Sequence, residues 1–130
     1  MNKQDILQAL NEFPYNRKEY WVVTGGAMVL YGIREQTGDI DLGCSKSMAD
    51  QLEADGLMLR ITENGKRCFH FGEKIEIFEE WLLDSIVMVE GFQIISVDGL
   101  LEMKKELGRK KDLKDIELIR EHIGSLTKTT

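Results

Sequence analysis

Three acidic residues set among large apolar ones are the part of the sequence best suited to chemistry. Asp39 and Asp41 alternate with apolar residues in the segment TGDIDLG, and Glu76 does so in the segment KIEIF. Side chains two positions apart on a β-strand project from the same face, with Cα atoms roughly 6.5 to 7 Å apart. The two aspartates are therefore expected to share a face, and all three carboxylates meet if the two strands are neighbours. Without a counter-charge, they would repel and raise one another's pKa values.

A bound divalent cation would remove that repulsion. Mg²⁺ prefers oxygen ligands, usually a few carboxylates together with water and phosphate oxygens. Two-metal phosphoryl-transfer sites hold their ions roughly 3.5 to 4 Å apart, a distance that two carboxylates on one face can bridge. We therefore expect Asp39, Asp41 and Glu76 to be catalytic metal ligands, with Mg²⁺ as the cofactor and Mn²⁺ as an alternative. A lone D-x-D pair is more often a solvated strand face, but alternation with large apolar residues favours a fixed strand.

A glycine pair precedes the carboxylates. Gly25 and Gly26 follow the apolar run from Tyr20 to Thr24. A turn without Cβ atoms lets backbone N–H groups approach phosphate oxygens at the start of a helix, and the Thr24 hydroxyl could add a further donor. Taken alone, the pair is explained more simply as an ordinary strand-to-helix turn. Its place before the carboxylates is what favours a nucleotide-binding role for residues 24–26.

The C-terminal part of the chain is rich in cations. Lys104 lies in the apolar stripe of a predicted helix, where a lysine either extends to solvent or reaches into a cleft. Arg109 follows the glycine that ends this helix. The formal net charge of −6 disfavours long duplex nucleic acid, whose binding depends on neutralised phosphates. The local basic cluster instead fits a small anionic ligand or one end of an RNA.

Length and composition indicate a single globular domain over residues 1–130. The 130 residues are 42% hydrophobic and 31% charged, with one proline, and a chain of this length buries roughly two-thirds of its unfolded surface. No apolar run approaches the roughly 20 residues of a membrane-spanning helix, and the N-terminal residues lack the apolar core of a signal peptide. We therefore expect a cytoplasmic protein without membrane contact, with Cys44 and Cys68 as free thiols.

Helices at both ends and strands in the middle predict an α/β or α+β domain with a mixed sheet. Asn64–Gly65 is typical of a hairpin turn, and Asp112 and Asp115 are typical of the N-cap and N3 positions of the last helix. The expected strands cover residues 20–24, 39–43, 57–62, 68–71, 75–78, 86–89 and 92–95. The expected helices lie around residues 6–10, from the glycine pair to residue 33, and over 45–54, 98–107 and 112–122.

These motifs, in this order, resemble the nucleotidyltransferase superfamily with the DNA polymerase β-like fold. The matching parts are the glycine pair, the Asp39-Ile40-Asp41-Leu42 segment and the glutamate between two isoleucines. Within the superfamily, the chain is most similar to the small bacterial abortive-infection type nucleotidyltransferase toxins and their relatives. Their K…R-x-K-D-x-x-D segment is matched from Lys104 to Asp115. The resemblance covers roughly residues 21–119 and implies a minimal nucleotidyltransferase fold, a mixed sheet flanked by helices.

The resemblance also implies a reaction. Asp39 and Asp41 would bind Mg²⁺, and Glu76 would complete the metal site and help to activate the incoming hydroxyl group. The glycine pair would hold the triphosphate, and Lys104 and Arg109 would contact phosphate. A nucleoside monophosphate would pass from a nucleoside triphosphate to a hydroxyl group of a small molecule, a tRNA end or a protein, with release of pyrophosphate. Further partners would be a second copy of the chain or an antitoxin.

The sequence departs from many members of the superfamily at two points. Ala27 follows the glycines where serine or threonine is common, and the third carboxylate is a glutamate rather than an aspartate. We also expect no sizeable acceptor-binding domain after the last helix. A second hypothesis is therefore a nucleotidyltransferase-like binding or regulatory module with weak or no catalysis, such as one half of a toxin–antitoxin pair. Retention of all three carboxylates favours the active enzyme.

Overall fold

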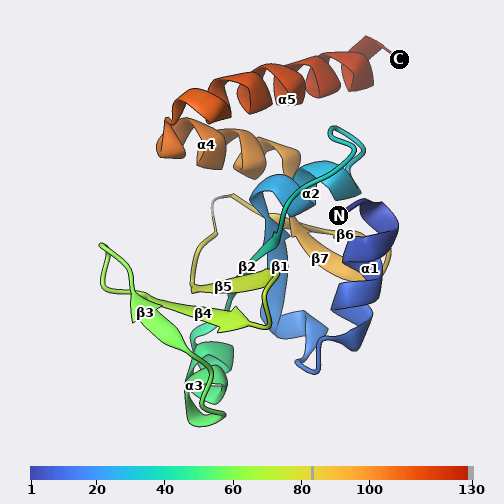
Figure 1. The fold of residues 1–130 in the computed structure, drawn as a ribbon. Helices are drawn as coiled ribbons and strands as arrows, with labels where there is room; N and C mark the ends of the chain where they lie inside the picture. Colours follow the sequence, from blue (N-terminus) through green and yellow to red (C-terminus); the bar gives the residue numbers. More distant parts are fainter. Residues whose placement is uncertain (83, 129–130) are drawn as a thin grey trace.

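A computed structural model describes residues 1–82 and 84–128, and its centre is one mixed seven-stranded sheet (Figure 1). The strand order is β3-β4-β5-β2-β1-β7-β6. The strands are β1 (Tyr20–Val23), β2 (Ile40–Cys44), β3 (Leu59–Ile61), β4 (Arg67–Phe71), β5 (Ile75–Glu79), β6 (Ile86–Val89) and β7 (Phe92–Ile95). The helices are α1 (Lys3–Glu12), α2 (Thr24–Leu30), α3 (Lys46–Ala54), α4 (Val97–Leu107) and α5 (Lys110–Lys128), with a short 3₁₀ helix, η1 (Arg17–Glu19). The expected α/β class is confirmed.

Four of the helices lie at the two ends of the sheet, and α1 lies beside it (Figure 1). α4 and α5 form an antiparallel pair at the end where α2 lies, whereas α3 lies at the other end, near β3 and β4 (Figure 1). Met28 of α2, Leu100 and Met103 of α4, and Ile119 of α5 are fully buried. The helical pair therefore packs over the ends of the central strands, where β1 ends and β2 begins.

The pairing of β2 with β5 positions the acidic residues. The two strands are parallel, and Asp41 lies directly opposite Glu76. Ile40 and Leu42 on β2 and Ile77 on β5 are fully buried, so one face of both strands packs into the core. Because side chains alternate along a strand, the acidic residues project from the other face. Register is strongly specified where one face is buried, so the apolar residues also determine which face carries the carboxylates.

Most elements match the sequence-based expectations, with shifts of a few residues at their ends. Ser45 caps α3 as expected, because its hydroxyl oxygen accepts a hydrogen bond from the backbone N–H of Met48. β3 is shorter than expected and begins at Leu59, and α2 ends at Leu30 rather than at residue 33. Thr24 is the first residue of α2 instead of the last residue of the preceding strand. The expected single domain over 1–130 includes residues 83, 129 and 130, which lie outside the described part.

Both cysteines are buried and free. Burial raises the pKa of the Cys44 thiol to about 12 and that of Cys68 to about 11, so both remain protonated near neutral pH. This agrees with the expectation of two free thiols. Among the helices of residues 1–82 and 84–128, none combines the length and the apolar character needed to cross a bilayer.

At Gly43, strand β2 lies very close to Trp21 and Trp81. It lies on the same face of β2 as Asp41, and its partner on β1 is Trp21. The indole Nε1 of Trp21 donates a hydrogen bond to the backbone oxygen of Trp81 at 2.8 Å. A Cβ atom on Gly43 would lie 2.1 Å from this nitrogen and 2.4 Å from this oxygen. Only glycine leaves room for the bond that holds Trp81 over the sheet.

Arg67 on β4 ties β5 to α3. Its guanidinium group forms two hydrogen bonds with Glu79, at 3.1 and 2.7 Å. It also donates to Asp50 at 2.8 Å and to Glu53 at 3.1 Å, both on α3. The hydrogen bonds from Arg67 lower the pKa of Glu79 to about 2, against the opposing effect of burial. The Glu79 carboxylate therefore stabilises the folded chain in its charged form.

The substitution Gly43→Ala is expected to lower the free energy of unfolding by about 1 to 3 kcal/mol, because the added methyl group overpacks the contact between Trp21 and Trp81. Chemical denaturation checks this value. Gly38→Ala is the matched control: a Cβ atom there meets nothing within 4 Å, so stability should change by less than about 0.5 kcal/mol. Equal effects of the two substitutions would contradict the packing argument.

The substitution Glu79→Gln is expected to cost on the order of 2 kcal/mol at neutral pH, because it removes a charge-assisted hydrogen-bond pair. A depressed folded-state pKa gives stability that is present above the unfolded pKa and is lost as the pH falls through the folded one. The difference in Tm between wild type and variant should therefore shrink between about pH 5 and pH 2. Glu121→Gln, on the exposed side of α5, should follow the wild type throughout. A constant difference would rule out this linkage.

Candidate active site

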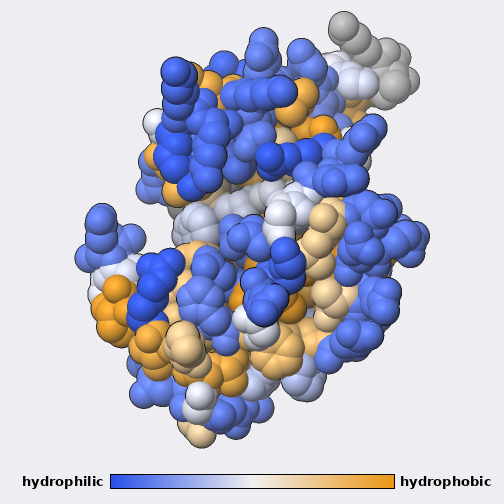
Figure 2. Space-filling model, viewed as in Figure 1, coloured by the Kyte–Doolittle hydropathy of each residue, from blue (hydrophilic) through white to orange (hydrophobic). Residues whose placement is uncertain are grey.

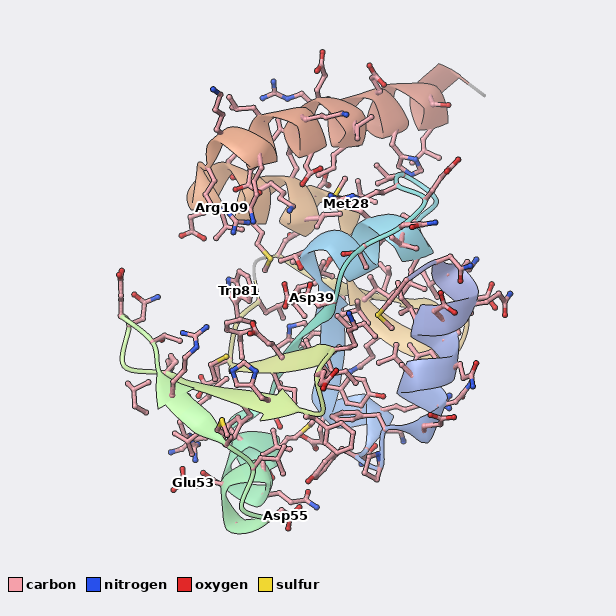
Figure 3. The ribbon with its side chains drawn as sticks, in the orientation of Figure 1. Met28, Asp39, Glu53, Asp55, Trp81 and Arg109 are labelled. Carbon is pink, nitrogen blue, oxygen red and sulfur yellow. The ribbon has the colours of Figure 1, made fainter. Side chains whose placement is uncertain are left out.

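The three acidic residues lie in one pocket. It is located at the ends of the central strands, where β1 ends and β2 and β5 begin. The pocket has a volume of about 490 Å³. Asp39, Asp41 and Glu76 line its sheet side, and the end of α4 and the start of α5 line the opposite side. Figure 3 shows Asp39 on the sheet side and Arg109 on the helical side. We call this cavity the carboxylate pocket.

Asp41 lies at the centre of the acidic group. It is opposite Glu76 and two residues after Asp39, which is exposed and immediately precedes β2. Burial raises the pKa of Asp41, and the charges of Asp39 and Glu76 raise it further. A hydrogen bond from the Thr24 hydroxyl group to Asp41 Oδ2, at 2.7 Å, and the charge of Lys104 oppose this shift. The mutual repulsion inferred from the sequence is thus present in the folded chain.

The glycine pair divides between the pocket and the core. Gly25 lines the carboxylate pocket, and a Cβ atom on it would lie 2.6 Å from the Thr37 hydroxyl oxygen. Gly26 is not among the residues that line this pocket, and a Cβ atom on it would lie 3.1 Å from the Val22 side chain. Thr24 adopts a φ of 53°, in the left-handed region that residues other than glycine rarely occupy. This turn directs the Thr24 hydroxyl group to Asp41 rather than into open space.

Lys104 and Arg109 also line the carboxylate pocket. Lys104 is only 4% exposed, so it reaches into the cleft instead of extending to solvent. Its Nζ atom lies 3.0 Å from Asp115 Oδ2 and 3.3 Å from Asp112 Oδ1. Arg109 donates to both carboxylate oxygens of Asp112, at 2.6 and 3.1 Å. Both cations therefore reach the site with carboxylate partners of their own.

The expected placement of Asp112 at the N-cap and of Asp115 at N3 of the last helix is wrong. α5 begins at Lys110, so Asp112 is its third residue, where its side chain accepts a hydrogen bond from the backbone N–H of Arg109 at 3.1 Å. The hydrogen bonds from Arg109 lower the pKa of Asp112 to about 2. Asp112 is fully buried and belongs to the ion-pair cluster of the pocket, as does Asp115. Asp112 therefore caps the helix from its third position and also binds the cations Lys104 and Arg109.

Four further polar residues line the pocket without having been expected at the site: Arg34, Thr37, Arg60 and Lys111. The first two come from the loop before β2, and Arg60 comes from β3, two strands beyond β5. Lys111 lies in the same cation-rich segment as Lys104 and Arg109, whereas nothing in the sequence places Arg60 near the site, because it lies on a strand whose place in the sheet the sequence does not show. In total the pocket is lined by five acidic residues (Asp39, Asp41, Glu76, Asp112, Asp115) and five basic ones (Arg34, Arg60, Lys104, Arg109, Lys111).

The carboxylate oxygens in the pocket are of the type that Mg²⁺ prefers as ligands. Within residues 1–82 and 84–128, no three His, Cys, Asp or Glu side chains are placed closely enough to form a ready cage for a metal ion. Mg²⁺ seldom uses such a cage, because it commonly takes one or two carboxylates and completes its shell with water and substrate phosphates. Asp39 and Asp41 offer oxygen ligands on one face, and burial, together with the charges of Asp39 and Glu76, raises the pKa of Asp41.

No known family model and no curated protein matches this sequence. Among solved structures, a protein from Thermotoga maritima described as a "putative nucleotidyltransferase" superimposes with a TM-score of 0.65. The two sequences are 17% identical, and the similarity covers 96% of each chain. At this level of identity, the likeness shows a common fold and assigns no residue roles. The chain is thus similar over nearly its whole length, in its α/β architecture, to a protein described as belonging to the nucleotidyltransferases.

Proposed function

We propose that this protein is a magnesium-dependent nucleotidyltransferase that moves a nucleoside monophosphate from a nucleoside triphosphate to a hydroxyl group. The observation that carries the proposal is the side-by-side placement of Asp41 and Glu76, with Asp39 next to them, in a pocket that also contains basic side chains. The fold shared with the Thermotoga maritima protein supports the same class of reaction.

The charges in the pocket favour joint binding of metal and nucleotide. Its acidic and basic residues are equal in number, so a triphosphate without a cation would gain little net attraction. Cations held by Asp39 and Asp41 would make the pocket positive and attract a polyphosphate. Arg60 and Lys111 form no ion pair with any other residue in the described part of the chain, so they are the cations most available to phosphate. Lys104 and Arg109 would share their charge between phosphate and their aspartate partners.

The reaction would be an in-line displacement at the α-phosphorus. The acceptor oxygen forms a bond to this phosphorus, the bond from the phosphorus to the bridging oxygen of the β-phosphate breaks, and pyrophosphate leaves. Glu76 would orient the acceptor hydroxyl group and receive its proton. Gly25, without a Cβ atom, would let the backbone approach the triphosphate. Bound Mg²⁺ would stabilise charge on the phosphate oxygens, and positioning and electrostatics would supply most of the rate enhancement.

A binding or regulatory module is the second candidate function. Thr24 already donates to Asp41, and the buried Lys104 is already paired with Asp112 and Asp115. These contacts fit a site that holds a nucleotide and Mg²⁺ without turning it over, as one half of a toxin–antitoxin pair could do. The two candidates differ in one measurable property, the transfer of label from the nucleotide.

A nucleoside triphosphate with Mg²⁺ is expected to raise the Tm of the wild-type protein, because a ligand that binds only the folded state stabilises it. At 100 times the Kd the gain is about 2.7 kcal/mol, which corresponds to about 10 °C for a chain of this size. Differential scanning fluorimetry measures the shift. The triphosphate with EDTA should give a much smaller shift. An unchanged Tm at millimolar ligand and Mg²⁺ would count against both candidate functions.

The substitution Asp41→Asn should reduce label transfer from α-labelled triphosphate, in the presence of a cell extract, by at least about 100-fold. It should leave the Tm of the ligand-free protein unchanged or slightly higher, because it removes a carboxylate whose charge is disfavoured by burial and by its neighbours. Glu121→Gln is the control and should transfer label as the wild type does. Transfer at the wild-type rate by Asp41→Asn would exclude this residue from catalysis, and absence of transfer by the wild type would favour the binding module.

A further inference from the structure

A second cavity adjoins the carboxylate pocket. It has a volume of about 640 Å³, and Phe78, Trp81 and Leu107 line both cavities. These three side chains form a wall common to the two. Phe78 follows Glu76 by two positions on β5, so it projects from the same face of the sheet about 6.5 to 7 Å further along. A molecule in the second cavity would therefore lie one strand repeat away from the carboxylates.

The two aromatic residues of the common wall, Phe78 and Trp81, are fixed by contacts with each other and with β1. The rings of Phe78 and Trp81 pack edge to face with their centroids 4.8 Å apart. The hydrogen bond from Trp21 to the backbone oxygen of Trp81 anchors the wall to β1. Leu82 and Met103 add further apolar surface to the second cavity. A cavity of this size and lining suits the flat or apolar body of a small molecule.

The polar rim of the second cavity is acidic. Its charged residues are four glutamates and two cations, namely Glu63, Glu79, Glu80, Glu106, Lys66 and Arg67. Arg67 is held by Glu79 at 2.7 Å, and Lys66 lies 3.6 Å from Glu80. Within the described part of the chain, neither the Glu63 nor the Glu106 carboxylate has an ion-pair or hydrogen-bond partner. The cavity therefore keeps two carboxylates that no cation neutralises.

The position of α4 adds to this negative potential. The helix ends at Leu107, and Met103, Glu106 and Leu107 from its last turns line the cavity. The carbonyl groups at the C-terminus of a helix carry partial negative charge that favours a nearby cation. The indentation between α4 and the β3–β4 hairpin in Figure 2 lies where residues of both elements line this cavity.

We propose that the second cavity binds the acceptor substrate, and that the acceptor is a small organic cation with an aromatic or apolar body and a free hydroxyl group. The inference rests on the nucleotidyltransferase function proposed above. The body would lie against Phe78 and Trp81, whose ring faces also attract a cation. The cationic group would pair with Glu63 and Glu106, and the hydroxyl group would extend past the wall toward Glu76. An RNA end is disfavoured, because its phosphates would meet these carboxylates.

Three alcohols that share a ring but differ in charge test the proposal: 3-(aminomethyl)benzyl alcohol, benzyl alcohol and 3-(hydroxymethyl)benzoate. Each is incubated with the full chain, Mg²⁺ and ATP labelled at the α-phosphorus, and kcat/KM for label transfer is measured. We expect the cationic alcohol to exceed the anionic one by roughly tenfold, the effect of two solvent-accessible charge pairs. The double variant Glu63→Gln/Glu106→Gln should reduce this ratio to less than about threefold. Glu102→Gln, an exposed position on α4 outside both cavities, should preserve it.

Binding without catalysis separates this inference from the proposed function. Titration with 3-(aminomethyl)benzyl alcohol, followed by tryptophan fluorescence, should show the same saturable binding for the wild type and for Asp41→Asn, and weaker binding for the double variant. Equal binding of all three alcohols, or no binding of the cationic one, would overturn the acceptor assignment even if ATP with Mg²⁺ raises the Tm. The expected order of binding without any label transfer would support the cavity assignment and count against the nucleotidyltransferase function.

Discussion

The parallel pairing of β2 with β5 is the constraint on which the candidate site depends. It places Asp41 beside Glu76 and Gly43 beside Phe78 on one face of the sheet. A slip of one residue would turn the acidic side chains toward the apolar core, where an unpaired carboxylate is costly. The buried residues on the opposite face therefore hold the core and the site in one register. The carboxylates, the aromatic wall and the second cavity then follow one another along the same face.

The acidic and the basic groups of the carboxylate pocket come from two different parts of the fold, the sheet and the α4–α5 connection. The sheet carries an acidic group, in which burial and the charges of Asp39 and Glu76 raise the pKa of Asp41. The α4–α5 connection carries a basic group, in which the buried Lys104 pairs with Asp112 at 3.3 Å. The basic group is largely neutralised within itself, whereas the acidic group is not. A bound cation would thus relieve a repulsion that exists in the folded chain, which makes the acidic group the part of the site that gains most from a ligand.

The alternation of apolar and acidic residues explains how much of the candidate site could be predicted from the sequence. A carboxylate between two large buried residues has one available face, so the grouping of the acidic residues could be inferred from the sequence. The pairing of β2 with β5 could not, because α3 and two strands separate them in the chain, and this topology is also what brings Arg60 to the pocket. The role of Asp112 could not be predicted from the sequence for a different reason. Aspartate is favoured at an N-cap, but this carboxylate binds Lys104 and Arg109, and the helix begins earlier, at Lys110.

The two adjoining cavities differ in charge, so they would favour different ligands. The carboxylate pocket has equal numbers of acidic and basic residues and would become positive if it bound a cation, whereas the second cavity has an acidic rim. A polyphosphate would be attracted to the first once it held a cation and repelled by the second, and an organic cation would have the opposite preference. Charges act strongly only within a Debye length of about 8 to 10 Å. The local arrangement therefore outweighs the net charge of −6, and both ligands would approach each other at the wall formed by Phe78 and Trp81, beside Glu76.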